Sequence, residues 1–542
     1  MLESSELTMK TNLDRLRNFS RRTLFRNGGL LAALGFLPRV GTRTAAADTV
    51  SGALQIGPTL YESIGVKPIV NCRGTFTIIT GSQSLPEVKR AMDEASRHYV
   101  HLDELMDAVS KRLAELTKAE WGIVTAGCAA AITHATAACI AGADPEKMQQ
   151  LPDLTGLRNE VIMPRHSRNV YDHAARMTGA TIVDVETPEQ LERAFNARTA
   201  MVMIMASPRA DTGPLRTEAV AAVARSKNVP LLVDAAAEVL TIPNIHLQHG
   251  ATMVAYSGGK CIRGPQSAGL LLGPKDLLQA AWLNSAPHHA FGRSLKVGKE
   301  EIMGMLAAVE MWTRRDHKAE WAQWESWLNH IDARAKTVRG VTSEIQQPED
   351  LSNHAPTLRL QWDGAALGIT GKEVEKLLWD GSPRIAVGGS TGVRPDAMKS
   401  SLTIMPYMMM PDDHKIAAEA IYTLLAKPPK FDNPPALQAP ATSLSGEWNV
   451  KIDYLRGNAH HIVVFEQREA ALVGTHESPT LKGDLRGSIH GSEVRFRSSH
   501  RFQGTAIGYE FTGNVQGDTI DGTVTMGEYG QARFTAIRHH YA

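Results

Sequence analysis

Hydrophobic residues follow two alternating patterns along most of this chain. Short runs of Val, Ile, Leu and Met with no polar alternation predict strands buried on both faces. These runs are residues 122–125, 160–163, 181–185, 200–205, 229–233, 253–256 and 267–272. The stretches at 85–99, 102–117 and 129–141 predict helices between or before them. Buried strands that alternate with helices indicate an α/β domain built on a mostly parallel sheet.

The pattern changes after this domain. A long helical stretch over 299–338 is expected to lead into a smaller α+β domain. Its predicted strands are 357–362 and 401–405, and its predicted helices are 373–379 and 412–425. A proline-dense run then begins at Lys427, and proline at this density excludes helix and sheet, so we interpret it as a linker.

The last hundred residues have a different character. Seven short runs separated by glycine turns predict strands at 447–454, 460–467, 471–475, 493–498, 509–515, 519–526 and 531–537. Strands at this spacing favour a small antiparallel β barrel or sandwich. The expected layout is a signal region at 1–47, a large domain at 48–300, a long helix and small domain at 301–426, a linker at 427–444 and a β-rich domain at 445–542.

The first 47 residues look like a targeting signal. The segment from Ser20 to Arg26 is similar to a twin-arginine export motif, and three alanines at 45–47 offer a cleavage point. The apolar run at 30–37 is much shorter than the about 20 residues that span a bilayer, so stable membrane insertion is not expected. We therefore expect a periplasmic protein, with a disordered basic leader as the alternative.

Composition narrows the function classes. A chain of 542 residues with 43% hydrophobic residues can bury sizeable cores. A net charge of +1 argues against a large nucleic-acid footprint. Four cysteines in so long a chain do not make a disulfide framework, and no zinc-binding spacing is present, so no metal is expected.

The candidate chemistry centres on a lysine and an aspartate. Lys260 follows a Ser-Gly-Gly turn, and Asp234 ends an apolar run 26 residues earlier. This pair suits pyridoxal 5'-phosphate (PLP), because the lysine amine can bind the cofactor aldehyde covalently and the carboxylate can keep the pyridine nitrogen protonated. A surface lysine and a helix cap or salt bridge are the alternative readings of the two residues.

Other residues complete the expected cofactor site. Gly127, Cys128 and Ala129 stand where a strand turns into a helix, and free N–H groups there favour a phosphate. Ser257 is expected to add a hydroxyl to the phosphate, and His166 to lie against the ring. Plain strand-to-helix packing and a solvated loop histidine remain the alternatives.

Four arginines are candidates for binding a substrate carboxylate or phosphate, because guanidinium groups bind such anions bidentately. Each also has an ordinary surface role as its alternative. They are Arg73, Arg165, Arg293 and Arg384.

The large domain resembles the seryl-tRNA selenium transferase-like group of PLP enzymes, which includes D-glucosaminate-6-phosphate ammonia-lyase. The resemblance rests on motifs that run from residue 68 to residue 299: PIVNCRGT, HLDEL, AGCA, VDAA, SGGK, GPQSAG and RSLKVGK. It implies an aspartate-aminotransferase fold with Lys260 linked to PLP, Asp234 at the pyridine nitrogen, and assembly as a homodimer or larger homo-oligomer. Lys296 stands where the group usually has an arginine, and the export leader replaces a tRNA-binding region.

The main functional hypothesis is a PLP-dependent lyase. It would perform an α,β-elimination on an amino acid or amino sugar acid and release ammonia, with a small-molecule amino substrate and no nucleic acid. One alternative is a PLP-dependent racemase, aminotransferase or β-replacement enzyme. Another is a non-catalytic periplasmic binding protein on a PLP fold, with the β-rich domain as its working part.

Overall fold

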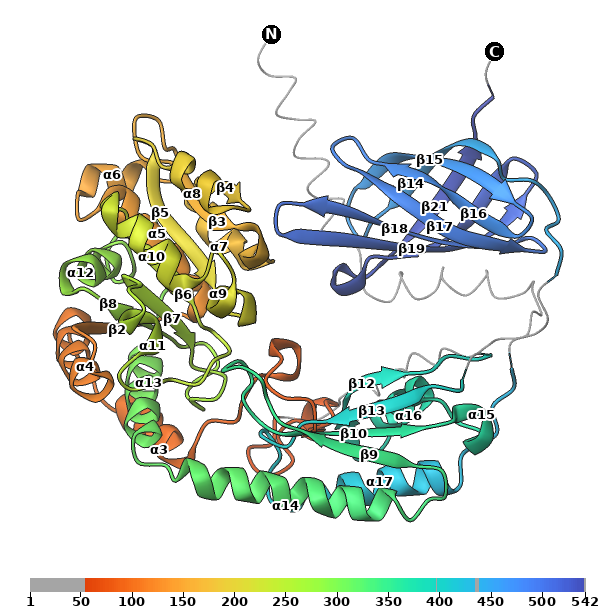
Figure 1. The fold of residues 1–542 in the computed structure, drawn as a ribbon, viewed down its shortest axis with the longest axis horizontal. Helices are drawn as coiled ribbons and strands as arrows, with labels where there is room; N and C mark the ends of the chain where they lie inside the picture. The colour runs from red at the N-terminus through yellow and green to blue at the C-terminus, as the bar shows by residue number, and fades with distance from the viewer. Residues whose placement is uncertain (1–53, 396, 434–437, 541–542) are drawn as a thin grey trace, which may run out of the picture. The chain divides into compact units, whose positions relative to one another are not determined.

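A computed structural model describes residues 54–395, 397–433 and 438–540 (Figure 1). The expected export signal lies outside the described residues. Residues 54–68 belong to a separate unit that contains one short 3-10 helix, η1 (Glu62–Ile64). Among the helices of the described ranges, none is both long enough and apolar enough to cross a bilayer.

The large domain is built on a seven-stranded sheet in the order β2-β8-β7-β6-β5-β3-β4. β8 is antiparallel to both β2 and β7, and the remaining pairs are parallel, which confirms the predicted mostly parallel sheet. The strands are β2 (Trp121–Thr125), β3 (Glu160–Pro164), β4 (Thr181–Val185), β5 (Thr199–Met205), β6 (Leu231–Asp234), β7 (Met253–Ser257) and β8 (Gly269–Gly273).

Helix α5 (Cys128–Ala141) is the central helix of this domain. It is rich in alanine and buried on nearly every side, so it approaches the sheet closely and contacts β5, β6, β7 and β8. The other helices are α3 (Pro86–Ser96), α4 (Leu102–Thr117), α6 (Pro145–Gln150), α7 (Asp172–Arg176), α8 (Pro188–Ala194), α9 (Pro208–Thr212), α10 (Thr217–Ser226), α11 (Ile245–Gln248) and α12 (Lys275–Leu283). Two 3-10 turns, η2 (Thr77–Ile79) and η3 (Arg165–Ser167), complete the domain.

The predicted single helix over 299–338 is wrong. The structure has two helices, α13 (Lys299–Trp312) and α14 (His317–Ala335). The break occurs because the Asp316 carboxylate accepts hydrogen bonds from the N–H groups of Lys318 and Ala319 and so caps a new helix. α13 packs on α3 and α4, whereas α14 packs on the small-domain helix α17 (Asp413–Ala426).

The small domain contains a four-stranded antiparallel sheet in the order β12-β13-β10-β9. Its strands are β9 (Thr342–Gln346), β10 (Thr357–Trp362), β12 (Gly388–Thr391) and β13 (Ser400–Ile404), with helices α15 (Gly364–Leu367) and α16 (Gly371–Asp380). A separate parallel pair joins β1 (Ile69–Asn71) to β11 (Arg384–Ala386). This pair holds residues 69–71 beside β11.

The C-terminal domain is a closed antiparallel barrel of eight strands, where the sequence predicted seven. The missed strand is β17 (Lys482–His490). The others are β14 (Gly446–Asp453), β15 (Asn458–Arg468), β16 (Ala471–Glu477), β18 (Glu493–Phe502), β19 (Thr505–Gln516), β20 (Thr519–Thr525) and β21 (Gln531–Arg538), with η4 (Gly527–Tyr529) between the last two. Large aromatic side chains fill the interior: Trp448, Phe465, Phe496, Phe511 and Phe534.

Three histidines form a buried chain inside this barrel. His461 Nδ1 lies 2.8 Å from His476 Nε2, and His476 Nδ1 lies 2.6 Å from the Ser498 hydroxyl. His500 Nε2 lies 2.9 Å from the His476 carbonyl oxygen. Among the described residues no group of three or more His, Cys, Asp or Glu side chains is arranged to hold a metal ion. Burial lowers the pKa of His461 to about 4 and that of His476 to about 2, so both rings are neutral near pH 7.

The barrel is therefore expected to lose stability as the pH falls. Between about pH 6.5 and pH 4, His461 is protonated in the unfolded chain but stays neutral in the folded barrel. Each such histidine lowers the unfolding free energy by up to about 1.4 kcal/mol for each pH unit of acidification in that range. Replacing His461 with Gln should make the unfolding free energy of the barrel fall less steeply from pH 7 to pH 5. Unfolding is measured by urea titration at each pH. The unfolded fraction of the barrel is read from the hydrogen exchange of its peptides after a labelling pulse at one fixed pH.

The matched control is His460→Gln, because His460 is the neighbouring residue on β15 and is exposed. Its variant should keep most of the wild-type pH dependence, because the charge of His460 lowers the pKa of His461 less than burial and the charge of His500 do. An H461Q barrel that loses stability as steeply as the wild-type barrel would contradict this account.

Candidate active site

Asp234 is a buried carboxylate at the carboxyl end of β6, and only 4% of the residue is exposed. Its Oδ1 accepts a hydrogen bond from the Ala236 N–H at 3.1 Å and one from the Cys128 thiol at 3.5 Å. Burial raises the pKa of this carboxyl group, while these hydrogen bonds and the charge of Lys260 oppose the rise. A positively charged or N–H group at the other carboxylate oxygen, Oδ2, would further compensate the buried charge.

Lys260 follows the neighbouring parallel strand, β7, so its loop starts from the same edge of the sheet as Asp234. The chain folds back tightly here, because a Cβ at Gly259 would lie 2.8 Å from Gln266 Cα. Lys260 Nζ donates a hydrogen bond of 3.2 Å to the Thr75 carbonyl oxygen. Burial lowers the pKa of this amine, and the nearby groups of Cys128 and Asp234 counteract that shift.

The predicted phosphate cradle lies at the start of α5. Gly127 has a φ of +90°, and a Cβ built on it would meet nothing within 4 Å, so the space beside it is open. The first N–H groups of α5, at Cys128 and Ala129, have no carbonyl partner within the helix. Backbone packing is tight on the other side, where a Cβ at Gly269 would lie 2.4 Å from Gly127 C. The structure thus brings the AGCA and GPQSAG motifs together.

His166 lies in η3, directly after β3. Its Nε2 is buried and has no hydrogen-bond partner among the described residues. Burial, and secondarily the charge of Arg209, lowers the pKa of the ring. His166, Arg165 and Arg209 line a common cavity of about 420 Å³, so Arg209 on α9 is a basic residue of this region that the sequence analysis missed. Ser257 is the last residue of β7, three before Lys260.

The four candidate arginines do not converge on Lys260 through any hydrogen bond or ion pair of the described residues. Three of them have other partners in the chain. Arg73 lies over the Phe76 ring at 4.9 Å, Arg165 pairs with Glu186 at 2.9 Å, and Arg384 donates to the Trp379 carbonyl oxygen at 2.9 Å. Arg293 is exposed in the segment after α12.

A network of three polar residues beside Lys260 was not found from the sequence. The Thr75 hydroxyl lies 2.9 Å from the Tyr407 hydroxyl, and both contact Asn353 Oδ1, at 3.3 and 3.2 Å. Since the Thr75 carbonyl accepts the bond from Lys260, this network fixes the acceptor of the amine. Its only sequence signal was the PIVNCRGT motif, which contains Thr75.

These residues fit PLP on three observations. Asp234 is buried, the space beside Gly127 is open at a helix N-terminus, and Lys260 is a half-buried amine in the loop that follows β7, the strand next to that of Asp234. A carboxylate, an anion-binding helix start and an amine are the groups that the pyridine nitrogen, phosphate and aldehyde require.

Comparisons with known proteins agree with this reading. Residues 163–292 match the family model of class-V aminotransferases. Over 336 residues the chain is 30% identical to D-glucosaminate-6-phosphate ammonia lyase of Salmonella typhimurium, covering 60% of this chain and 88% of that protein. It is also 30% identical to a 5'-C-glycyluridine monooxygenase-decarboxylase of a Streptomyces species, covering 60% and 83%.

More distant similarity extends to L-seryl-tRNA(Sec) selenium transferase of Proteus mirabilis, at 24% identity over 47% of this chain and 58% of that protein. Among solved structures, a D-glucosaminate-6-phosphate ammonia-lyase superposes with a TM-score of 0.60 at 27% identity, covering 68% of this chain and 98% of the other. The resemblance and the fold class inferred from the sequence are therefore confirmed. The chain belongs to the family of PLP-dependent enzymes of aspartate-aminotransferase fold that includes D-glucosaminate-6-phosphate ammonia lyase and L-seryl-tRNA(Sec) selenium transferase.

Proposed function

We propose that this enzyme is a lyase that removes the β-hydroxyl of an amino acid or amino sugar acid and releases ammonia. The observation that carries the proposal is the placement of Asp234 at the end of β6 and of Lys260 in the loop after the adjacent parallel strand β7, in a chain 30% identical to an ammonia lyase. All three curated relatives named above are enzymes, so the alternative of a binding protein without turnover has no support among them.

In this proposal the chain's residues divide the work. Asp234 holds the pyridine nitrogen, the start of α5 with Gly127, Cys128, Ala129 and Ser257 holds the phosphate, and His166 lies against the ring. When bound, PLP withdraws electrons from the substrate α-carbon. The Lys260 amine, whose pKa is lowered by burial, accepts the α-proton in its neutral form. The β C–O bond then breaks as the proton held by the Lys260 amine passes to the hydroxyl, which leaves as water. Hydrolysis of the resulting enamine gives a keto acid and ammonia.

Substrate binding is assigned to the four arginines identified in the sequence. Arg384 at the start of β11 and Arg73 after β1 are the choices for the α-carboxylate, because β1 and β11 pair with Ile69 opposite Arg384. Arg165 lines the same cavity as His166 and Arg209, so it is the choice for a second anionic group such as a phosphate. Arg293 is exposed and its role in binding is supported by the family motif alone.

We also propose that the protein works as a homodimer or larger homo-oligomer in the periplasm. The twin-arginine motif supports export, and the common oligomeric assembly of this fold supports self-association. Size-exclusion chromatography with light scattering and fractionation of cells that express the full chain test the two proposals separately.

Replacing Lys260 with Ala should abolish both turnover and the visible absorbance of covalently bound PLP, because no other amine is expected to bind the aldehyde. Ammonia release is measured on β-hydroxy amino acids and on 2-amino-2-deoxy sugar acids with and without a 6-phosphate. Lys372→Ala on the exposed face of α16 is the control and should retain both properties. Carbon dioxide release in place of ammonia would favour the decarboxylase-like chemistry of the Streptomyces relative.

Replacing Asp234 with Asn should lower turnover by about 100-fold or more, the usual scale for losing one acid–base group. The amide preserves shape and hydrogen bonding but no longer keeps the pyridine nitrogen protonated. PLP should still bind, with a shifted absorbance maximum, as equilibrium dialysis and spectrophotometry would show. A D234N variant with wild-type turnover would remove Asp234 from the mechanism.

A further inference from the structure

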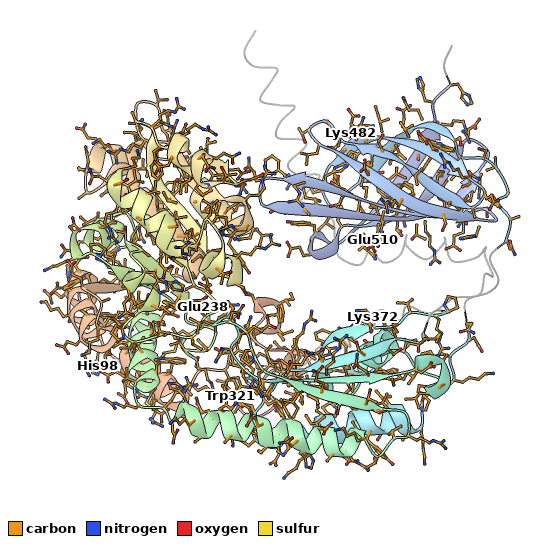
Figure 2. The ribbon with its side chains drawn as sticks, viewed as in Figure 1. His98, Glu238, Trp321, Lys372, Lys482 and Glu510 are labelled. Atoms are coloured by element: carbon orange, nitrogen blue, oxygen red, sulfur yellow. The ribbon has the colours of Figure 1, made fainter. Side chains whose placement is uncertain are left out.

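A second cavity lies where α13 gives way to α14. Its volume is about 420 Å³, and its wall contains Trp312, Trp321, Trp324, Trp327, Tyr407 and Arg263. We call it the tryptophan cavity. Figure 2 labels Trp321, which stands on α14. The lining includes neither Lys260 nor Asp234, so this cavity is not the cofactor site described above.

The aromatic walls present apolar ring faces. Ring centroids of Trp321 lie 6.0 Å from Trp324 and 5.3 Å from His354, and those of Trp324 and Tyr407 are 6.0 Å apart. The indole N–H groups of Trp312 and Trp321 are already used, donating to the Leu240 carbonyl oxygen at 2.7 Å and to Glu325 Oε1 at 3.1 Å. The ring faces of these residues give part of the wall a flat hydrocarbon surface, which suits a planar apolar ligand.

Two cations of the wall, Arg263 and the exposed Lys318, form no ion pair within the described ranges, and Arg263 is the half-buried one. Arg315 is neutralised by Glu320 through bonds of 2.8 and 3.0 Å. Arg263 makes one bond, from Nε to the Gln83 carbonyl oxygen, and within the described ranges no carboxylate forms an ion pair with it. Its guanidinium is half-buried. Burial and the charge of Arg315 lower its pKa, and the charge of Glu320, which is already paired with Arg315, opposes that shift. A partly buried, unpaired guanidinium is stabilised by an anion that accepts its remaining N–H groups.

We propose that the tryptophan cavity binds a second small molecule, a flat apolar ring system that carries one carboxylate or similar anionic group. The ring would lie against the tryptophans and the anion would pair with Arg263. This site goes beyond the proposed lyase function, because ligand binding in the tryptophan cavity does not depend on the reaction at Lys260. Two of its lining residues connect it to Lys260. Arg263 lies three residues beyond Lys260, and the Tyr407 hydroxyl contacts the hydroxyl of Thr75, whose carbonyl oxygen accepts the hydrogen bond of the Lys260 amine.

The test uses calorimetric titration of the full, PLP-loaded chain with 2-naphthoate and with its neutral analogue 2-naphthamide. We expect one 2-naphthoate site per chain and weaker binding of the amide. Arg263→Gln should weaken 2-naphthoate by about 10-fold or more, on the scale of a lost charged hydrogen bond, and leave 2-naphthamide within about twofold. Arg263→Lys keeps the cation and should retain the preference for the acid.

Two further variants control for folding and location. Trp321→Ala should weaken both probes, because it removes ring surface that either would contact. Arg193→Gln, on the exposed side of α8, should bind like the wild type. The proposal is contradicted if neither probe shows saturable binding to the wild-type chain. This holds whether the cavity is closed or is covered by a second copy of the chain. Binding that occurs only in the PLP-free chain, or an acid preference that survives R263Q in a folded protein, would also contradict it.

Discussion

A carboxylate buried at the end of a central strand is the constraint around which the large domain is organised. A bare charge at this depth would be costly, so neighbouring groups must compensate it. The Ala236 N–H and the Cys128 thiol approach one oxygen of Asp234, and the amine of Lys260 acts at longer range. Cys128 also begins α5, so the same residue links the carboxylate to the helix start that suits a phosphate. Sheet order completes the arrangement, because β7 lies beside β6 and delivers Lys260 to the same edge.

Much of the fold follows from local patterns in the sequence. The helix at 102–117 and the strands at 181–185 and 357–362 coincide with α4, β4 and β10, because their hydrophobic periodicity is strong and their ends are marked. β17 was missed because glycine and charge dilute its pattern to two inward residues, Leu485 and Ile489. One glycine there is required by packing, since a Cβ at Gly487 would lie 2.2 Å from the Arg495 carbonyl oxygen. The break between α13 and α14 has neither proline nor glycine, and only the capping by Asp316 reveals it.

The site was predictable where its residues are close in sequence and unpredictable where they are not. Asp234 ends β6 and Lys260 follows β7, the next strand along the chain, so their spacing carried the prediction. Thr75 contacts Asn353 and Tyr407, which are 278 and 332 residues away in the sequence. Local sequence patterns do not predict contacts over such separations. The arginines illustrate the opposite limit. Their residue type suits an anion, but type alone did not reveal that Arg165 pairs with Glu186 or that Arg384 lies over Trp379 at 5.0 Å.

The most direct measurement of the central claim is the position of the covalent link to PLP. Borohydride reduction of the PLP-loaded protein, followed by peptide mapping with mass spectrometry, should find a single pyridoxyl group on the peptide that contains Lys260. A pyridoxyl group on another lysine, or none on any peptide at full PLP occupancy, would contradict the account.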